Sequence, residues 1–218
     1  MPRRKRGGSN RAIGALAAGA AALLLLGSMG KGSSGEALPR GRWSSYRYAL
    51  ESMSRRKYGG EEISRIIKYM PLVEMYSEQY GVNPALVAAI CHVESRFRPD
   101  AESSAGAQGM MQIMPSTWKY RTDKMGISGD PFDPKANIQV GTDYIDTLIS
   151  SFQGEDEMFY KAIASYNAGI GRVKNAIRDN GSGWMSAIPA ETRTYVKSVV
   201  DSWNDFEDAY SIAYKDGM

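Results

Sequence analysis

The stretch PALVAAICHVES, residues 84–95, decides the fold of this chain. Asn83 and Pro84 form a good N-cap and first-turn pair, so the stretch is predicted to be a helix from Pro84 to about Ser95. Apolar residues lie all round this helix, which is typical of a helix that crosses the core of a domain. Glu94 stands at its end, where partial burial would raise the pKa of the carboxyl, as a general acid near neutral pH requires. The alternative is an ordinary last-turn glutamate in water.

The segment that follows, residues 94–112, reads ESRFRPDAESSAGAQGMMQ. Gly106 and Gly109 stand among small residues, before an apolar run that ends at Pro115. Glycines in such positions allow tight turns and let a polymeric ligand approach the backbone closely. We therefore expect turns or a small hairpin over residues 101–112, beside Glu94.

Four motifs follow one another along the chain: Glu94-Ser95, AESSAGAQGMMQIMP at 101–115, ASYNAG at 164–169 and IPAETRTYV at 188–196. In this order they resemble the Slt-type soluble lytic transglycosylases, a family related to goose-type lysozyme. The resemblance implies a lysozyme-like fold and cleavage of peptidoglycan. Met110 stands where leucine is usual in the family, and an apolar exchange of similar volume should be tolerated.

The rest of the sequence predicts further helices and no run of strands. Apolar residues at helical spacing indicate the helices, and the last of them carries Tyr195, Val199, Val200 and Trp203 at core spacing. We predict a mainly α, lysozyme-like single domain with a small β or irregular segment beside the catalytic helix. The expected helices cover 61–80, 115–125, 134–152, 156–167, 171–178 and 189–206.

The N-terminal thirty residues are expected to lie outside the fold. They hold five Lys or Arg, no acid and an apolar run, which is typical of a secretory signal with Ser28 and Gly30 near a possible cut. The alternative is an uncleaved membrane anchor over residues 12–29, which would associate the protein with the inner membrane. The remaining predicted boundaries are a linker and basic arm at 31–60, the catalytic domain at 61–206 and a C-terminal tail at 207–218.

Composition excludes several classes of function. Without residues 1–30 the chain holds 22 Lys and Arg against 24 Asp and Glu, so it lacks the basic surface of a nucleic-acid binder. Cys91 and His92 are the only cysteine and histidine, so neither a disulfide within the chain nor a His- or Cys-based zinc site is possible. We expect Cys91 to pack as a small hydrophobe. His92 lies about 200° round the helix from Glu94, so a triad that combines them is excluded and no metal or cofactor is predicted.

What remains is carboxylate chemistry. Ordinary glycosidases use two carboxylates, and the candidates for a second one here are Asp100, Glu102 and Glu191. The resemblance implies a different solution, in which the 2-acetamido group of N-acetylmuramic acid attacks its own C1. Glu94 would first protonate the glycosidic oxygen and then take a proton from the C6 hydroxyl, which closes a 1,6-anhydro ring without water.

The resemblance also assigns supporting roles by motif position. Two residues would orient the site, since Ser95 follows the acid and Asn167 would tie loops together. The alternatives are a simple helix-end serine for Ser95, loop filler for Ser103, a core position for Tyr166 and a buried hydrogen-bonding centre for Glu191. The expected substrate-binding residues are Ser103, Met111, Gln112, Tyr166 and Glu191.

The predicted function is therefore that of a peptidoglycan lytic transglycosylase, exported to the periplasm or cell envelope. Its partners would be peptidoglycan glycan strands and no nucleic acid, and we expect a monomer. One alternative is a hydrolytic muramidase on the same scaffold, which differs only in whether water reaches C1. The other is a catalytically silent glycan-binding envelope protein.

Overall fold

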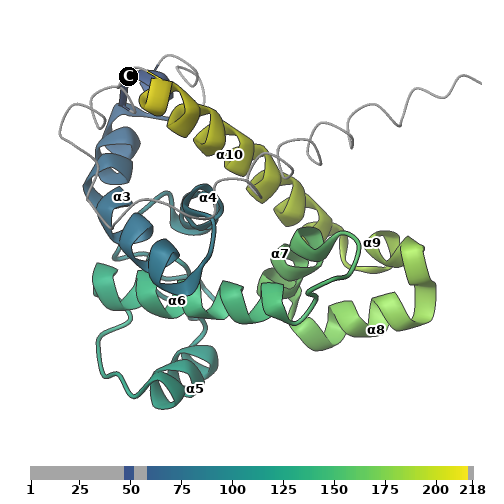
Figure 1. Cartoon of the computed structure of the whole chain (residues 1–218). Helices are drawn as coiled ribbons and strands as arrows, with labels where there is room; N and C mark the ends of the chain where they lie inside the picture. Colours follow the sequence, from purple (N-terminus) through teal and green to yellow (C-terminus); the bar gives the residue numbers. More distant parts are fainter. Residues whose placement is uncertain (1–46, 52–57, 216–218) are drawn as a thin grey trace, which may run out of the picture. The chain divides into compact units, whose positions relative to one another are not determined.

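The computed structural model describes residues 47–51 and 58–215 (Figure 1). The predicted signal or anchor at 1–30 and most of the predicted linker lie outside these residues. None of the described helices is long and apolar enough to cross a membrane. The helices are α3 (Gly60–Tyr80), α4 (Pro84–Ser95), α5 (Pro115–Met125), α6 (Pro134–Ser150), α7 (Met158–Ala168), α8 (Ile170–Asn180), a 3₁₀ turn η1 (Gly181–Gly183), α9 (Trp184–Ala187) and α10 (Ala190–Lys215).

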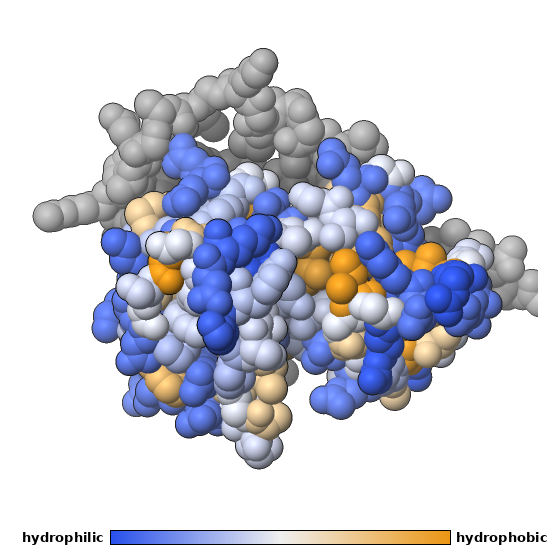
Figure 2. Space-filling view, turned by 90° about the horizontal axis from the view of Figure 1, so that it is seen from below, coloured by the Kyte–Doolittle hydropathy of each residue, from blue (hydrophilic) through white to orange (hydrophobic). Residues whose placement is uncertain are grey.

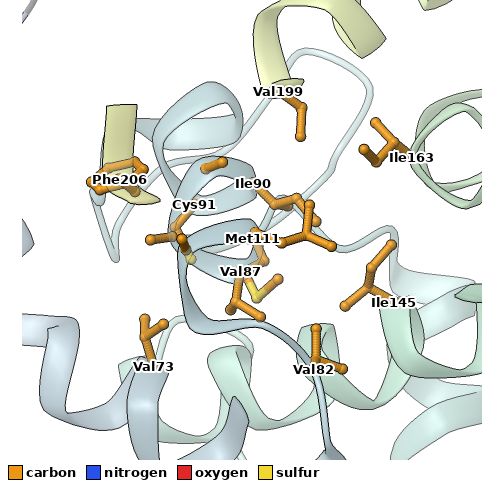
Figure 3. Close-up of a cluster of buried hydrophobic side chains, with 14 of the residues drawn as sticks. Val73, Val82, Val87, Ile90, Cys91, Met111, Ile145, Ile163, Val199 and Phe206 are labelled. Atoms are coloured by element: carbon orange, nitrogen blue, oxygen red, sulfur yellow. The ribbon is translucent and has the colours of Figure 1, made fainter. Parts of the chain in front are cut away.

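Helix α4 crosses the core, as its composition predicts. The side chain of Asn83 accepts hydrogen bonds from the backbone N–H groups of Ala85 and Leu86 at 2.8 and 3.3 Å, so the predicted N-cap is confirmed. All residues from 85 to 91 are buried. Figure 3 shows α4 side chains among apolar residues from several other helices. Those labelled there include Val87, Ile90, Cys91, Val73 of α3, Ile145 of α6, Ile163 of α7 and Val199 of α10.

The mainly α fold class is confirmed, and so are several predicted helix ends. Gly81 ends α3 in the left-handed conformation, with its φ at 69°. Helix α5 has the predicted bounds, and the Asp133 side chain caps α6 through the N–H of Lys135 at 3.0 Å. Helices α7 and α8 lie within two residues of their predicted limits at each end.

Helix α10 is longer than predicted. It continues past Phe206 to Lys215, so the expected tail is wrong for residues 207–215. The last three residues of that predicted tail lie outside the described residues. The added turns bury Ala209, Tyr210 and Ala213, which continue the helical spacing that starts at Phe206. The C-terminal segment is therefore part of the packed domain.

The described part of the predicted linker and basic arm also belongs to the domain. Residues 47–51 are helical, and Ala49, Leu50 and Tyr58 are buried. The Tyr58 hydroxyl donates to Asp205 of α10 at 3.1 Å, and its ring meets His92 edge-on at 4.7 Å. The predicted arm is therefore packed against the domain at these residues.

The segment between α4 and α5 is irregular, as predicted. Two isolated antiparallel bridges join Glu102 to Gln108 and Gln108 to Ile113. The N–H of Ser103 donates to the carbonyl of Ala107 at 2.9 Å and closes the tip of the turn. This segment, residues 101–114, is called the catalytic loop below because it lies against the end of α4.

Candidate active site

Glu94 occupies the last turn of α4 and is half-buried. Its Oε1 accepts a hydrogen bond of 2.7 Å from the hydroxyl of Tyr195 in α10. Burial raises the pKa of Glu94 from its ordinary value of 4.5 to about 7, and the Tyr195 hydrogen bond lowers it and so offsets part of that rise. The carboxyl can therefore hold or release a proton near neutral pH.

Ser95 connects the end of α4 to the catalytic loop. Its buried hydroxyl donates to the carbonyl of Met110 at 2.7 Å, and it accepts from the N–H of Arg98 at 3.1 Å. The chain then turns sharply, because Arg96 and Phe97 both have positive φ, at 54° and 58°. Such a conformation costs a non-glycine residue energy, and here the fully buried Phe97 ring is held in the core. Glu94 thus projects from a helix end that is fixed on both sides.

Two tyrosine hydroxyls lie close to the Glu94 carboxyl. Tyr195 bonds to it directly, while Tyr166 of α7 donates to the backbone carbonyl of Met111 at 2.9 Å. Burial, and after it the neighbouring charge of Glu94, raise the pKa of both tyrosines well above the usual range. Both hydroxyls are therefore protonated donors at any physiological pH.

The side chain of Met111 does not line a substrate site, so that prediction is wrong. It is fully buried in the core, where Figure 3 shows it beside Val87 and Ile90. A Cβ added at Gly141 of α6 would come within 2.3 Å of the Met111 Sδ. Only the backbone of Met111 is used in the site, with its N–H bonded to Asn137 at 2.8 Å and its carbonyl to Tyr166.

Gln112 and Ser103 both hold the catalytic loop together. Gln112 has a φ of 47°, and its side-chain amide donates to the carbonyls of Ala101 and Gly109 at 2.9 Å each. The Ser103 hydroxyl accepts from the N–H of Ala107 at 2.9 Å. Both residues are partly exposed, so their expected contacts with substrate stay predictions.

Gly109 is required by the protein's own packing. Its φ is 75°, and an added Cβ would lie 2.3 Å from both the Asn137 side chain and the Pro131 carbonyl. At Gly106, where φ is 83°, an added Cβ would meet nothing within 4 Å. The expected close approach of a glycan to these glycines stays a prediction.

Asn167 and Glu191 lie where α7 ends and α10 begins. The exposed Asn167 side chain accepts a hydrogen bond of 2.8 Å from the hydroxyl of Thr192, which links the two helices. Glu191 is exposed in the first turn of α10, so the alternative of a buried hydrogen-bonding centre is wrong. Its role as a substrate contact stays a prediction.

A second carboxyl with a raised pKa lies elsewhere in the fold. Burial raises the pKa of Glu74 in α3 to about 7, although a hydrogen bond of 3.0 Å from the Tyr210 hydroxyl lowers it. Tyr210 lies roughly 22 Å along α10 from Tyr195, at 1.5 Å per residue. Glu74 is therefore remote from Glu94 and outside the motifs.

The sole histidine takes no part in the site. His92 Nδ1 lies 2.6 Å from the Glu62 carboxylate of α3, on another side of α4 from Glu94. Among the residues that the structure describes, no three His, Cys, Asp or Glu side chains gather in a way that could hold a metal ion.

Tyr195 is the functional residue that sequence reasoning missed. Its helical spacing placed it among the core residues of the last helix, and it is indeed mostly buried. The available signal was its position in the motif IPAETRTYV, where it is the only aromatic side chain. Its hydroxyl, and not its ring, distinguishes it from the core residues that follow.

The surface is hollowed on one face. Figure 2 shows a notch in this face. Helix α5 lies toward one side of the notch and α8 toward the other, as Figure 1 helps to locate. Polar side chains cover most of this face, and an apolar patch borders the notch.

Comparison with known proteins places this geometry in a family. The profile described as "Transglycosylase SLT domain" matches residues 71–188. The chain is similar to membrane-bound lytic murein transglycosylase C of Actinobacillus succinogenes, with 37% identity over 126 residues, which are 53% of this chain and 35% of the relative. It is 34% identical to the soluble lytic murein transglycosylase of Escherichia coli K12 over 145 residues, which are 62% and 22% of the two chains.

Solved structures give the same result for the fold. An inactive mutant of the lytic transglycosylase Slt from Pseudomonas aeruginosa aligns with a TM-score of 0.59 and 30% identity, over 72% of this chain and 27% of that one. The 70 kDa soluble lytic transglycosylase of Escherichia coli aligns with the same TM-score and 27% identity, over 76% and 30%. The matched part is about a third or less of each of these proteins.

Proposed function

The chain belongs to the transglycosylase SLT domain family, and from this premise we propose that it is a peptidoglycan lytic transglycosylase. It would cleave the β-1,4 bond between N-acetylmuramic acid and N-acetylglucosamine and leave a 1,6-anhydromuramic end. One observation carries the proposal: Glu94 has a pKa of about 7 and is held by Tyr195 at the end of a rigid core helix.

A pKa near 7 suits a residue that must act first as an acid and then as a base. Protonated Glu94 would donate to the glycosidic oxygen while the acetamido oxygen of the N-acetylmuramic acid attacks C1. The bond between C1 and the glycosidic oxygen breaks, and the N-acetylglucosamine leaves with a free hydroxyl. The C6 hydroxyl would then lose its proton to the Glu94 carboxylate and bond to C1, which releases the acetamido group. Glu94 ends protonated again, and no water is consumed.

The surrounding residues would set the geometry of these steps. Tyr195 would hold the carboxyl in place, and Tyr166 would hold the catalytic loop through the Met111 carbonyl. Ser95 and Asn167 would be positioning residues, since each joins two segments of the site. Ser103, Gln112, Tyr166 and Glu191 remain the proposed contacts with the glycan.

The hydrolytic alternative needs a second carboxylate to activate water. The three candidates, Asp100, Glu102 and Glu191, are all exposed, and none has the burial of Glu94. Glu74 shows that a pKa of about 7 alone does not mark a catalytic carboxyl, but Glu94 has this pKa inside the family motifs, which a silent glycan-binding protein would not need. The transglycosylase therefore accounts best for the site.

The proposed partner is the glycan strand of peptidoglycan, which the notch in Figure 2 could receive. We propose that residues 1–30 export the protein to the cell envelope, as a cleaved signal or as an anchor over 12–29, and that it acts as a monomer. Peptidoglycan lies outside the cytoplasmic membrane, so the proposed substrate requires export.

Digestion of purified sacculi should release chains that end in 1,6-anhydro-N-acetylmuramic acid. The acetamido group supplies the nucleophile, so chains stripped of their acetyl groups should resist cleavage. Mass spectrometry separates the two product types, because anhydro and reducing ends differ by one water. Mainly reducing ends would support the muramidase, and no cleavage of intact sacculi would support the silent binder.

Tyr195→Phe should move the alkaline limit of activity to higher pH and lower the maximal rate. The Tyr195 hydroxyl lowers the pKa of Glu94, so its removal raises that pKa and keeps the acid protonated further into the alkaline range. A hydrogen bond to a charged group is worth about 1.5–3 kcal/mol, so we expect the rate to fall by about tenfold or more. Rates measured from pH 5 to 9 test this.

The matched control is Tyr210→Phe. It makes the same change on the same helix and removes the hydroxyl from Glu74, whose pKa is also about 7. Its activity profile should follow that of the wild type. Equal profiles for Tyr195→Phe and the wild type would remove Tyr195 from the site.

A further inference from the structure

A buried arginine joins helix α5 to α6, beside the partly buried Trp118 and Met125 of α5. Within α5 the buried residues are Arg121 and Thr122, and Arg121 is only 5% exposed. Its Nη1 donates to the Asp143 carboxylate at 2.8 Å and to the Thr147 hydroxyl at 2.7 Å, both on α6. Figure 1 shows α5 below α6. A buried guanidinium is costly unless it has such partners, so these two hydrogen bonds are needed to keep Arg121 in this position.

The orientation of this guanidinium is set by stacking as well as by hydrogen bonds. The buried Nε of Arg121 has no hydrogen-bond partner among the described residues. The guanidinium carbon instead lies 4.8 Å from the centre of the Tyr144 ring. A desolvated guanidinium over a tyrosine face is attracted by the ring, so stacking offsets the unpaired Nε.

Tyr144 of α6 lies between Arg121 and a residue of the proposed active site. Its ring lies 5.1 Å from that of Tyr166, at an interplanar angle of 39°. Tyr166 in turn donates to the Met111 carbonyl, beside Glu94. Arg121, Tyr144 and Tyr166, here called the stack, thus lead from α5 through α6 to α7.

We propose that Arg121 and Tyr144 are positioning residues, which fix the Tyr166 ring so that its hydroxyl holds the Met111 carbonyl and the catalytic loop in register with Glu94. The inference rests on the proposed function, because the loop matters only if Glu94 acts on a bound glycan. A ring that is packed on one face by Tyr144 loses freedom to rotate, and displacements of about 1 Å at a reacting centre are costly.

The test compares variants that remove the stack with variants that spare it. Arg121→Lys keeps the charge but loses the planar group, and Tyr144→Leu loses the ring. For both we expect kcat on soluble glycan strands to fall between about tenfold and about a hundredfold while KM stays close to that of the wild type. Tyr144→Phe keeps the ring and should retain the wild-type kcat.

Lys119→Met is the matched surface control. It removes a cation from the same helix, but the Lys119–Asp123 pair is exposed, so kcat should not change. Circular dichroism and thermal unfolding report whether each variant folds. If Arg121→Lys does not fold, the comparison of Tyr144→Leu with Tyr144→Phe decides the question.

A double mutant separates positioning from a general loss of stability. If Arg121 acts through the Tyr166 hydroxyl, then adding Arg121→Lys to Tyr166→Phe should cause no further loss of kcat. Losses that multiply, or an unchanged kcat in Arg121→Lys and Tyr144→Leu, would overturn the positioning role. A wild-type protein that releases no anhydro ends would overturn the proposed function instead, so the two failures are distinguishable.

Discussion

Glu94→Gln is expected to abolish cleavage of peptidoglycan while leaving the fold intact. The amide has the same size and can still accept the hydrogen bond from Tyr195, but it cannot donate a proton and retrieve it. General acid–base assistance contributes about 10²–10⁴-fold in rate, so activity should fall by at least that much. Turbidity of a suspension of sacculi measures the loss, and clearance at the wild-type rate would remove Glu94 from the mechanism.

The same variant should be more stable than the wild type at alkaline pH. The pKa of Glu94 is about 7 in the folded state against an ordinary 4.5, so between these values the folded state binds more protons than the unfolded state. The free energy of unfolding of the wild type therefore falls as pH rises through this range, and the amide has no such dependence. Melting temperatures should be similar below pH 4.5 and higher for Glu94→Gln at pH 8. A lower value at pH 8 would mean that the inactive variant is simply misfolded.

Gly109→Ala should cause the largest loss of stability among single changes in the catalytic loop. At its φ of 75° an alanine costs about 1–2 kcal/mol, and its Cβ would collide with Asn137 and Pro131. Asn137 is fully buried and bonds to Met111, Gln108 and Pro131, so moving it leaves buried polar groups unpaired at about 1–3 kcal/mol. Chemical denaturation should show a loss of about 2–5 kcal/mol.

Gly106→Ala is the control for this prediction. It shares the positive φ, at 83°, but its Cβ would lie in open space. Its loss should be limited to the conformational cost of about 1–2 kcal/mol. Equal losses for the two variants would show that the contacts with Asn137 do not stabilise the loop.

Much of the helical fold could be predicted because its signals are local. The N-cap of α4 and the left-handed Gly81 each depend on residues within one turn, so the sequence contains what is needed to find them. The extension of α10 could also have been predicted, because Phe206, Ala209, Tyr210 and Ala213 repeat at helical spacing. The prediction stopped at Phe206 although the pattern continues.

The parts that could not be predicted depend on contacts between distant residues. Tyr195 meets Glu94 across 101 positions of sequence, and no local pattern records that pairing. Met111 lies in an irregular loop, where neither helical nor strand periodicity tells which side chain faces inward. The Met111 side chain fits in the core because Gly141 of α6 has no side chain there. This fit depends on how the loop packs against α6, which no local sequence pattern shows.

The dependence of the site on α10 has a consequence for the timing of activity during synthesis. Glu94 is complete only when Tyr195 has reached it, and α10, the last helix of the described chain, packs on α4 over much of its length. A chain grows from its N-terminus, so Tyr195 leaves the ribosome after Glu94, the catalytic loop and Tyr166. An emerging or C-terminally clipped polypeptide therefore carries its acid without the group that orients it. Until Tyr195 is in place we therefore expect low activity from the proposed enzyme, as in Tyr195→Phe.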